Sequence, residues 1–241
     1  MNESCLIDIA IAKTEKYASR ESGDTVELIE RPRGGVSVVM IDGQGSGRAA
    51  KTLSLLLSSK AVALVKEGVR DGVVARATHD YLFAFRHGQV SATLDLLSID
   101  LKTSSIVITR NAEAPMLIAD EHGGRAEPTT AGPIGRYQWT KPVVTELPMR
   151  PGIQLALFTD GISHAGRRKG LPPLDFDAVA RSLFDPSRSA QQLADAMLAL
   201  AMERDGFHPG DDMAVVAVSL MAADHAMAPV VRRMQAQIPV P

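Results

Sequence analysis

Short strand-like segments that follow one another through the middle of the chain constrain its fold more than any other sequence feature. They are predicted at 92–100, 105–110, 115–119, 143–147 and 153–158. The first three are separated only by the polar turns that begin at Lys102 and Asn111. Turns this short leave no room for a helical crossover, so these neighbours should pair antiparallel. A loop over 123–135 leads to the last two strands.

Helices are predicted on either side of these strands, wherever apolar residues recur at helical spacing. The predicted helices are 49–67, 73–86, 175–184 and 189–203, and the remaining predicted strands are 6–12, 25–30, 36–41 and 213–220. Ser189 stands at the position of an N-cap, and Gly68 stands where the first helix should stop. Because the elements show no repeating βαβ order, we predict an α+β layered fold.

Composition and charge limit the class of protein. The chain has 241 residues, of which 45% are hydrophobic, and these values predict one globular domain over 1–220 with a flexible C-terminal tail over 221–241. A formal net charge of −2 argues against nucleic acid or an anionic membrane as a partner. The basic clusters Arg31-Pro-Arg33 and Arg167-Arg-Lys169 are interpreted as solvated loops. With a single cysteine, Cys5, and no long apolar run, a cytoplasmic location is expected.

Acidic turns follow or precede apolar strands at three places in the sequence. Asp42-Gly and Asp160-Gly follow predicted strands, and Asp211-Asp212 precedes the last one. Each alone is an ordinary turn. Together they can bring carboxylates to one end of a sheet structure, where Mg²⁺ or Mn²⁺ collects oxygen ligands. No pair of histidines or cysteines is spaced to compete for a zinc ion.

A pair of divalent metals would suit the hydrolysis of a phosphate ester. Two ions about 3.5–4 Å apart can neutralise the ester oxygens and activate a bridging water, so no side-chain nucleophile is needed. The sequence has no Gly-x-Ser-x-Gly elbow, no Cys-x5-Arg loop and no Walker A run. The glycines over 43–47 superficially suggest a dinucleotide loop, but they lack the Gly-x-Gly-x-x-Gly spacing.

These motifs resemble those of the type 2C metal-dependent protein phosphatases, in the bacterial branch of sporulation and stress-regulating serine/threonine phosphatases. The resemblance spans about residues 6–220. It is carried by Asp42-Gly-x-Gly-Ser-Gly, Thr159-Asp-Gly-Ile162 and Gly210-Asp-Asp-Met213, with weaker support from Arg110-Asn-Ala-x-x-Pro115 and Gly132-Pro-Ile-Gly135. It implies an antiparallel β-sandwich flanked by helices, in four α/β/β/α layers, with two Mn²⁺ or Mg²⁺ ions at one end.

The resemblance also implies roles for individual residues. Asp42 would bridge both metals, Asp160 and Asp211 would complete one of them, and the carbonyl of Gly43 would serve the other. Asp24, in Ser-Gly-Asp, would approach the second metal directly or through water. The sequence does not decide between Asp211 and its neighbour Asp212 as the ligand.

The chain departs from the branch in a few places. Ser46 stands where a histidine is common, Ser163-His164 where an acidic residue is common, and Ala214 where a threonine is common. None of these departures removes an expected ligand. The implied substrates are phosphoserine or phosphothreonine on anti-sigma antagonist or stressosome scaffold proteins. Two alternatives stay open: a catalytically lost phosphatase-like module that docks a phosphorylated partner, and a two-metal hydrolase of phosphodiesters or nucleotides.

Overall fold

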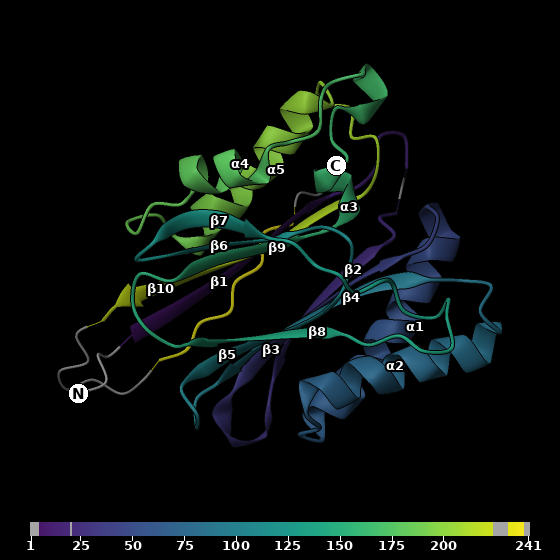
Figure 1. Cartoon of the computed structure of the whole chain (residues 1–241), viewed down its shortest axis with the longest axis horizontal. Coiled ribbons are helices and arrows are strands. Elements are labelled where there is room, and N and C mark those ends of the chain that lie inside the picture. The colour runs from purple at the N-terminus through teal and green to yellow at the C-terminus, as the bar shows by residue number, and fades with distance from the viewer. Residues whose placement is uncertain (1–4, 20, 224–230, 239–241) are drawn as a thin grey trace.

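A computed structural model describes residues 5–19, 21–223 and 231–238 and contains two antiparallel sheets packed face to face (Figure 1). In chain order the strands are β1 (Cys5–Thr14), β2 (Asp24–Glu30), β3 (Val36–Gly43), β4 (Ala92–Asp100), β5 (Ser105–Asn111), β6 (Met116–Asp120), β7 (Gly123–Glu127), β8 (Val143–Pro148), β9 (Gln154–Phe158) and β10 (Met213–Ala222). One sheet has the order β1-β10-β9-β6-β7 and the other the order β2-β3-β4-β5-β8.

Helices cover the outer face of each sheet. They are α1 (Gly47–Lys66), α2 (Asp71–Arg86), α3 (Asp160–Ser163), α4 (Phe176–Leu183) and α5 (Ala190–Arg204), with 3-10 turns η1 (Pro32–Gly34) and η2 (Arg167–Lys169). The pair α1 and α2 lies against the sheet that contains β3, and α4 and α5 lie against the sheet that contains β10 (Figure 1). The predicted α+β sandwich in four layers is therefore confirmed.

The apolar runs of the central strands follow from this layering. In β3, Val39 and Ile41 pack beneath the helices, whereas Val38 and Met40 face the opposite sheet. Successive strand residues point to opposite faces, and here both faces are covered. A strand of this kind has no solvent-facing side, so its sequence is apolar at nearly every position.

A buried ion pair lies between the two sheets. Arg110 on β5 donates from Nε to Asp95 Oδ1 on β4 at 2.7 Å, and the side chains are 3% and 2% exposed. Arg110 Nη2 also donates to the carbonyl of Ala114 at 2.7 Å. Burial raises the pKa of Asp95, and the neighbouring guanidinium opposes that rise. Of the ion pairs among the described residues, this one has the two most buried side chains.

The predicted elements match the observed ones except at three places. The segment Gly123–Glu127, expected as part of a loop, forms the edge strand β7, which pairs with β6. Its sequence Gly-Gly-Arg-Ala-Glu has almost no apolar residue, so no periodicity marks it. The strand predicted over 153–158 is β9, but the Asp160-Gly pair that follows it, expected as a turn, begins the short helix α3.

The expected tail over 221–241 begins inside β10, which extends to Ala222. Residues 231–238 form neither helix nor strand, and residues 224–230 and 239–241 of the predicted tail lie outside the described residues. Within the part of the chain that the structure describes, no helix has the length and apolarity needed to cross a bilayer.

Candidate metal site

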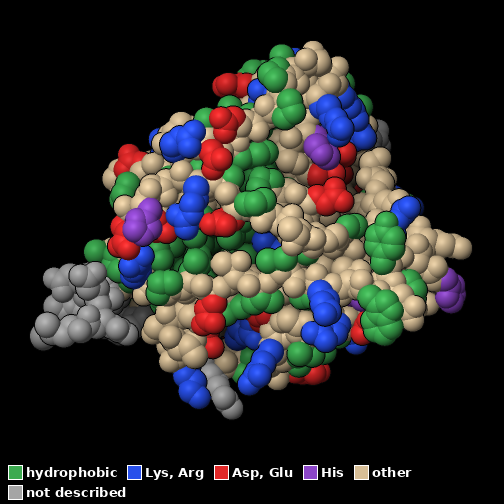
Figure 2. Space-filling model, in the orientation of Figure 1, with side chains coloured by type: hydrophobic (Ala, Val, Ile, Leu, Met, Phe, Trp, Pro, Cys, Tyr) green, Lys and Arg blue, Asp and Glu red, His purple; other side chains and the backbone are tan. Residues whose placement is uncertain are grey.

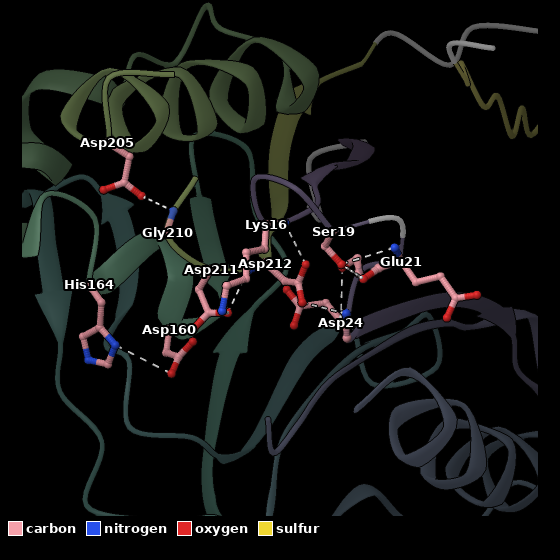
Figure 3. Close-up of polar contacts among 12 residues, drawn as sticks. Lys16, Ser19, Glu21, Asp24, Asp160, His164, Asp205, Gly210, Asp211 and Asp212 are labelled. Carbon is pink, nitrogen blue, oxygen red and sulfur yellow. Dashed lines mark hydrogen bonds and ion pairs between the residues drawn. The ribbon is translucent and has the colours of Figure 1, made fainter. Parts of the chain in front are cut away.

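A cavity of about 470 Å³ opens at one end of the sandwich, where strands of both sheets terminate. Its walls are unusually acidic, and the carboxylates come from Asp24, Asp42, Glu113, Asp160, Asp211 and Asp212. The first two belong to the sheet of β3, whereas Asp160 and Asp211 flank strands of the other sheet. Figure 3 shows Asp24, Asp160, Asp211 and Asp212 gathered around this opening.

Strand pairing brings Asp42 and Asp24 together. Asp42 near the end of β3 lies directly opposite Asp24 at the start of β2, so the two side chains share one face of the sheet. Thr159 Oγ1 donates to Asp24 Oδ2 at 2.8 Å and accepts from the amide of Ala214 at 2.9 Å. This hydroxyl therefore links the acidic end of one sheet to β10 of the other.

The glycines that follow Asp42 and Asp160 are required by close backbone packing. A β-carbon on Gly43 would stand 2.5 Å from the carbonyl oxygen of Ala50 on α1. A β-carbon on Gly161 would stand 2.0 Å from the carbonyl oxygen of Asp212. Both distances are shorter than any tolerable contact with backbone. In each Asp-Gly pair, the backbone of another segment therefore packs directly against the glycine, next to the aspartate that lines the cavity.

Asp160 and Asp211 occupy the open side of the cavity. Their side chains are 44% and 43% exposed. His164 Nδ1 lies 3.6 Å from Asp160 Oδ2, and Lys16 Nζ lies 3.9 Å from Asp211 Oδ1. Because water reaches both carboxylates, they can change rotamer at little cost.

Asp212 is used differently from Asp211. Its Oδ1 accepts the amide of Lys16 at 2.9 Å, and its Oδ2 accepts the amide of Gly23 at 2.7 Å. Both donors belong to the segment between β1 and β2, which leads into Asp24. Asp212 is 5% exposed, and each of its oxygens is occupied by a backbone donor. It acts as a clamp on the segment that positions Asp24.

Burial and mutual repulsion make this cluster prefer protons or cations. Burial, followed by the charges of Asp24 and Asp160, raises the pKa of Asp42 to about 9. Burial and the nearby Asp212 carboxylate raise the pKa of Asp24 to about 7. Among the residues that the structure describes, no lysine, arginine or histidine forms an ion pair with either carboxylate. Hard divalent cations are the natural counterions for such a set of oxygens.

The carboxylates share one cavity but do not meet at one point. Within the described ranges, no three acidic, histidine or cysteine side chains are close enough together to hold an ion as they stand. The donor chemistry nevertheless fits Mg²⁺ or Mn²⁺, because all the donors are oxygens and neither Asp24 nor Asp42 has an ion-pair partner among the described residues. The exposed Asp160 and Asp211 are the ones free to move inward.

The raised pKa values predict how pH affects the stability of the protein in a chelator. A carboxyl with a raised pKa holds its proton more tightly in the folded than in the unfolded state, so it stabilises the fold at low pH. For Asp42 this stabilisation is lost as pH rises from about 4 towards about 9. In Asp42→Asn that loss disappears. We therefore expect the metal-free variant to be more stable than the parent at pH 8, by about 1 kcal/mol or more, or roughly 2–4 °C in melting temperature. At pH 4 the two should melt together, and a difference that does not change with pH would contradict this cause.

The structure brings together every aspartate that the sequence singled out. Asp24, Asp42, Asp160 and Asp211 line one cavity, and Gly43 follows Asp42 at its edge. Sequence reasoning missed three contributors, which are Lys16, Glu113 and Thr159. Only Thr159 carried a signal, because it stands beside Asp160 in the quoted Thr-Asp-Gly-Ile motif. Lys16 and Glu113 lie in polar turns that no pattern separates from other turns.

The comparisons with known proteins agree with this architecture. Residues 32–221 match the family described as Stage II sporulation protein E (SpoIIE). The PP2C phosphatase domain and a regulatory fragment of SpoIIE from Bacillus subtilis superimpose with a TM-score of 0.78 at 21% identity, over 90% of this chain and 64% of that one. The RsbU and RsbW domains of a Mycobacterium tuberculosis protein give 0.73 at 21% identity, over 90% of this chain and 61% of that one.

A third similar structure is the catalytic domain of the serine/threonine phosphatase PstP in complex with two manganese ions, with a TM-score of 0.67 and 13% identity over 90% of this chain and 100% of that one. At these identities the likeness concerns the fold. The chain spans about two thirds of the first two structures, and no curated protein sequence matches it.

Proposed function

Because this chain belongs to the stage II sporulation protein E family, we propose that it is a metal-dependent serine/threonine phosphoprotein phosphatase. The observation that carries the proposal is the convergence of four aspartates from two sheets on one cavity, with no ion pair to Asp24 or Asp42 among the described residues. The manganese pair bound by the related PstP domain supports the same cofactor class for this chain.

The positions of the residues in the cavity suggest a different role for each of them. Asp42, Asp160 and Asp211 would hold the Mn²⁺ or Mg²⁺ pair, with Asp24 and the carbonyl of Gly43 completing it. When bound, such a pair supplies Lewis-acid polarisation of a phosphoryl group and a nucleophile at neutral pH. The charges of Asp24, Asp160, Asp211 and Asp212 all raise the pKa of Asp42, so it is near every other aspartate of the cavity, which favours it as the central ligand. Thr159 fixes the carboxylate of Asp24 through its hydroxyl.

Asp211 is the better candidate than Asp212 for a ligand. Asp211 is partly exposed, and the amide of Asp212 is the only backbone donor to its carboxylate within the described residues. Asp212 holds two backbone amides that are far away in sequence. Turning Asp212 towards an ion would leave those amides without acceptors, at a cost of about 1–3 kcal/mol each.

The substrate class and the setting of the reaction are part of the same proposal. Relatives that carry RsbU domains or are described with the bacterial stressosome support a phosphorylated regulatory protein, such as an anti-sigma antagonist or a stressosome scaffold, as the substrate. A cytoplasmic location and a role in stress signalling go with that substrate class. The neutral overall balance, with a formal net charge of −2, fits a protein partner better than a nucleic acid.

Metal-dependent hydrolysis of an aryl phosphate tests the proposal. The purified chain should hydrolyse p-nitrophenyl phosphate and a phosphothreonine peptide with added Mn²⁺ or Mg²⁺, and an excess of chelator should lower the rate to background. Activity that survives the chelator would contradict a metal mechanism. Binding of Mn²⁺ without turnover of any phosphopeptide would instead favour a catalytically lost module that docks a phosphorylated partner. Selective turnover of a phosphodiester would favour a two-metal hydrolase of phosphodiesters or nucleotides.

A further inference from the structure

A short basic turn stands beside the acidic cavity. We define the basic turn as the side chains of η2, namely Arg167, Arg168 and Lys169, all of which are exposed. Among the described residues, none of the three forms an ion pair with a carboxylate. Figure 2 shows basic side chains gathered directly above an acidic group on this face of the molecule. The charges of the basic turn are therefore available to bind an acidic partner.

The fold fixes the basic turn to the metal-binding loop. The Asp205 carboxylate accepts the amide of Gly166, just before the turn, at 2.7 Å and the amide of Gly210, just before Asp211, at 2.6 Å. Figure 3 shows the second of these contacts. Asp205 is only 7% exposed. One buried carboxylate therefore holds the start of the basic turn and the start of the Asp211 segment in a fixed relation.

Further contacts hold the turn in place. Arg204 donates from Nε to the carbonyl of Ala165 at 3.1 Å, and its Nη2 donates to the carbonyl of Pro172. Gly166 and Gly170, on either side of η2, adopt the left-handed conformation with φ of 84° and 70°. These positions define where the chain enters and leaves the turn, so its three side chains project from a constrained backbone.

The basic turn is close enough to the proposed reaction centre for a few residues of an extended peptide to span the distance between them. Arg168 passes over Gly210, with its Nε 3.2 Å from where a β-carbon on that glycine would stand. The short helix α3 and a three-residue turn over 164–166 connect Asp160 to Arg167, and seven residues folded this compactly span on the order of 10 Å. An extended peptide advances about 3.3 Å per residue. A side chain two to four positions from a phosphorylated residue in the cavity would reach the turn.

We propose that the basic turn binds acidic residues of the substrate, two to four positions from the phosphorylated serine or threonine. The inference rests on the proposed phosphatase function and adds a sequence preference to it. The acidic cavity wall repels a negatively charged peptide except where metal ions or the basic turn neutralise it. Arg167 and Arg168 can each bind a carboxylate through two parallel hydrogen bonds, whereas Lys169 offers a point charge.

A flexible acidic segment fits this surface better than a continuous polyanion. An RNA strand or an anionic bilayer would lay further negative charge across Asp160, Asp211 and Glu113, beside the turn. A peptide can place one or two acidic side chains on the turn and keep neutral residues over the cavity wall. The favoured partner is therefore a protein segment with acidic residues near its phosphorylation site.

The test compares matched phosphothreonine peptides in the presence of Mn²⁺. One set carries glutamate at positions two to four before or after the phosphothreonine, and the other carries glutamine there. The full chain should show a kcat/KM about three- to tenfold higher for the glutamate peptide of the preferred side, as expected for one or two exposed charge pairs. In the triple variant Arg167→Gln/Arg168→Gln/Lys169→Gln the ratio should fall to about one, while hydrolysis of p-nitrophenyl phosphate stays unchanged.

A charge-matched control separates local binding from net charge. The variant Lys66→Gln/Arg70→Gln/Lys102→Gln removes three exposed cations at the other end of the sandwich and should keep the parent's peptide ratio. Melting curves establish that both triple variants are folded. A parent enzyme that hydrolyses the aryl phosphate but treats both peptide sets alike overturns the inference and leaves the proposed function intact.

Binding measurements cover the case in which no turnover occurs. If neither metal supports aryl phosphate hydrolysis, the proposed function fails. Fluorescence anisotropy would then decide the inference: the labelled glutamate phosphopeptide should bind the parent more tightly than it binds the first triple variant, and equal affinities overturn the proposal. Loss of binding to RNA or to phosphatidylserine vesicles in that variant, without any peptide preference, would assign the turn to another macromolecule and would also overturn it.

Discussion

Replacing Asp42 with asparagine is expected to lower Mn²⁺-dependent hydrolysis of p-nitrophenyl phosphate by about a thousandfold or more. Asparagine keeps the shape of the side chain but removes the carboxylate whose pKa the other four aspartates of the cavity raise, and with it the charge that would bind the metals. Lewis-acid stabilisation by a metal pair is worth several kcal/mol, and about 4 kcal/mol corresponds to a factor of a thousand in rate. Steady-state rates over a range of Mn²⁺ concentrations measure the effect.

The matched control for this variant is Asp195→Asn, which removes an exposed carboxylate from α5. It should retain the parent's rate and metal dependence. The Asp42→Asn protein should remain folded, since its stability in chelator is expected to equal or exceed that of the parent. A rate within a few-fold of the parent's would contradict the assignment of Asp42 as a ligand.

Breaking the buried ion pair should have the largest effect on stability. Arg110→Met leaves Asp95 in the interior without its partner, and removing one member of a buried pair costs about 3–5 kcal/mol. For a chain of this size the loss corresponds to a fall in melting temperature of roughly 6–20 °C. The deficit should shrink as pH falls, because an unpaired Asp95 can take up a proton and become neutral. Thermal melts at several pH values measure both effects.

Arg125 provides a surface comparison. Its side chain is 38% exposed and contacts Asp120 and Glu127, each at 3.0 Å. Exposed pairs contribute about 0–1 kcal/mol, so Arg125→Met should melt within a few degrees of the parent. The double variant Asp95→Leu/Arg110→Met should recover much of the loss, since an apolar pair leaves no buried charge. If Arg110→Met and Arg125→Met destabilise the protein equally, the interior location of the first pair has no energetic consequence.

The central strands could be predicted because burial leaves a clear pattern in their sequence, whereas the four-layer sandwich was implied by the family resemblance. A strand covered on both faces, such as β3 or β10, is apolar at nearly every position and stands out from its neighbours. The edge strand β7 is held by backbone pairing to β6 and by contact with α4, where a β-carbon on Gly124 would stand 2.6 Å from the carbonyl of Ala180. Neither cause requires a particular side-chain pattern, so β7 could not be predicted from periodicity.

The candidate site was predictable in its residues but only partly in their roles. The aspartates stand at strand ends, where the topology gathers them, and this follows from the order of motifs. The difference between Asp211 and Asp212 depends on amides about 190 residues away in sequence, at Lys16 and Gly23. Likewise, Asp205 joins the basic turn to the Asp211 segment through a contact with Gly166, 39 positions earlier. Contacts of this range leave no local trace in the sequence.

The division of the acidic residues between the two sheets links ion binding to the cohesion of the whole domain. Asp24 and Asp42 belong to one sheet, Asp160 and Asp211 flank strands of the other, and the hydroxyl of Thr159 already spans the gap between them. Any cation that draws these four carboxylates together resists separation of the sheets at that end. An ion that binds the folded state alone, at a free concentration one hundred times its dissociation constant, raises the free energy of unfolding by about 2.7 kcal/mol. The concentration of divalent metal would thus set how firmly the two halves of the sandwich are held together, as well as whether the protein is active.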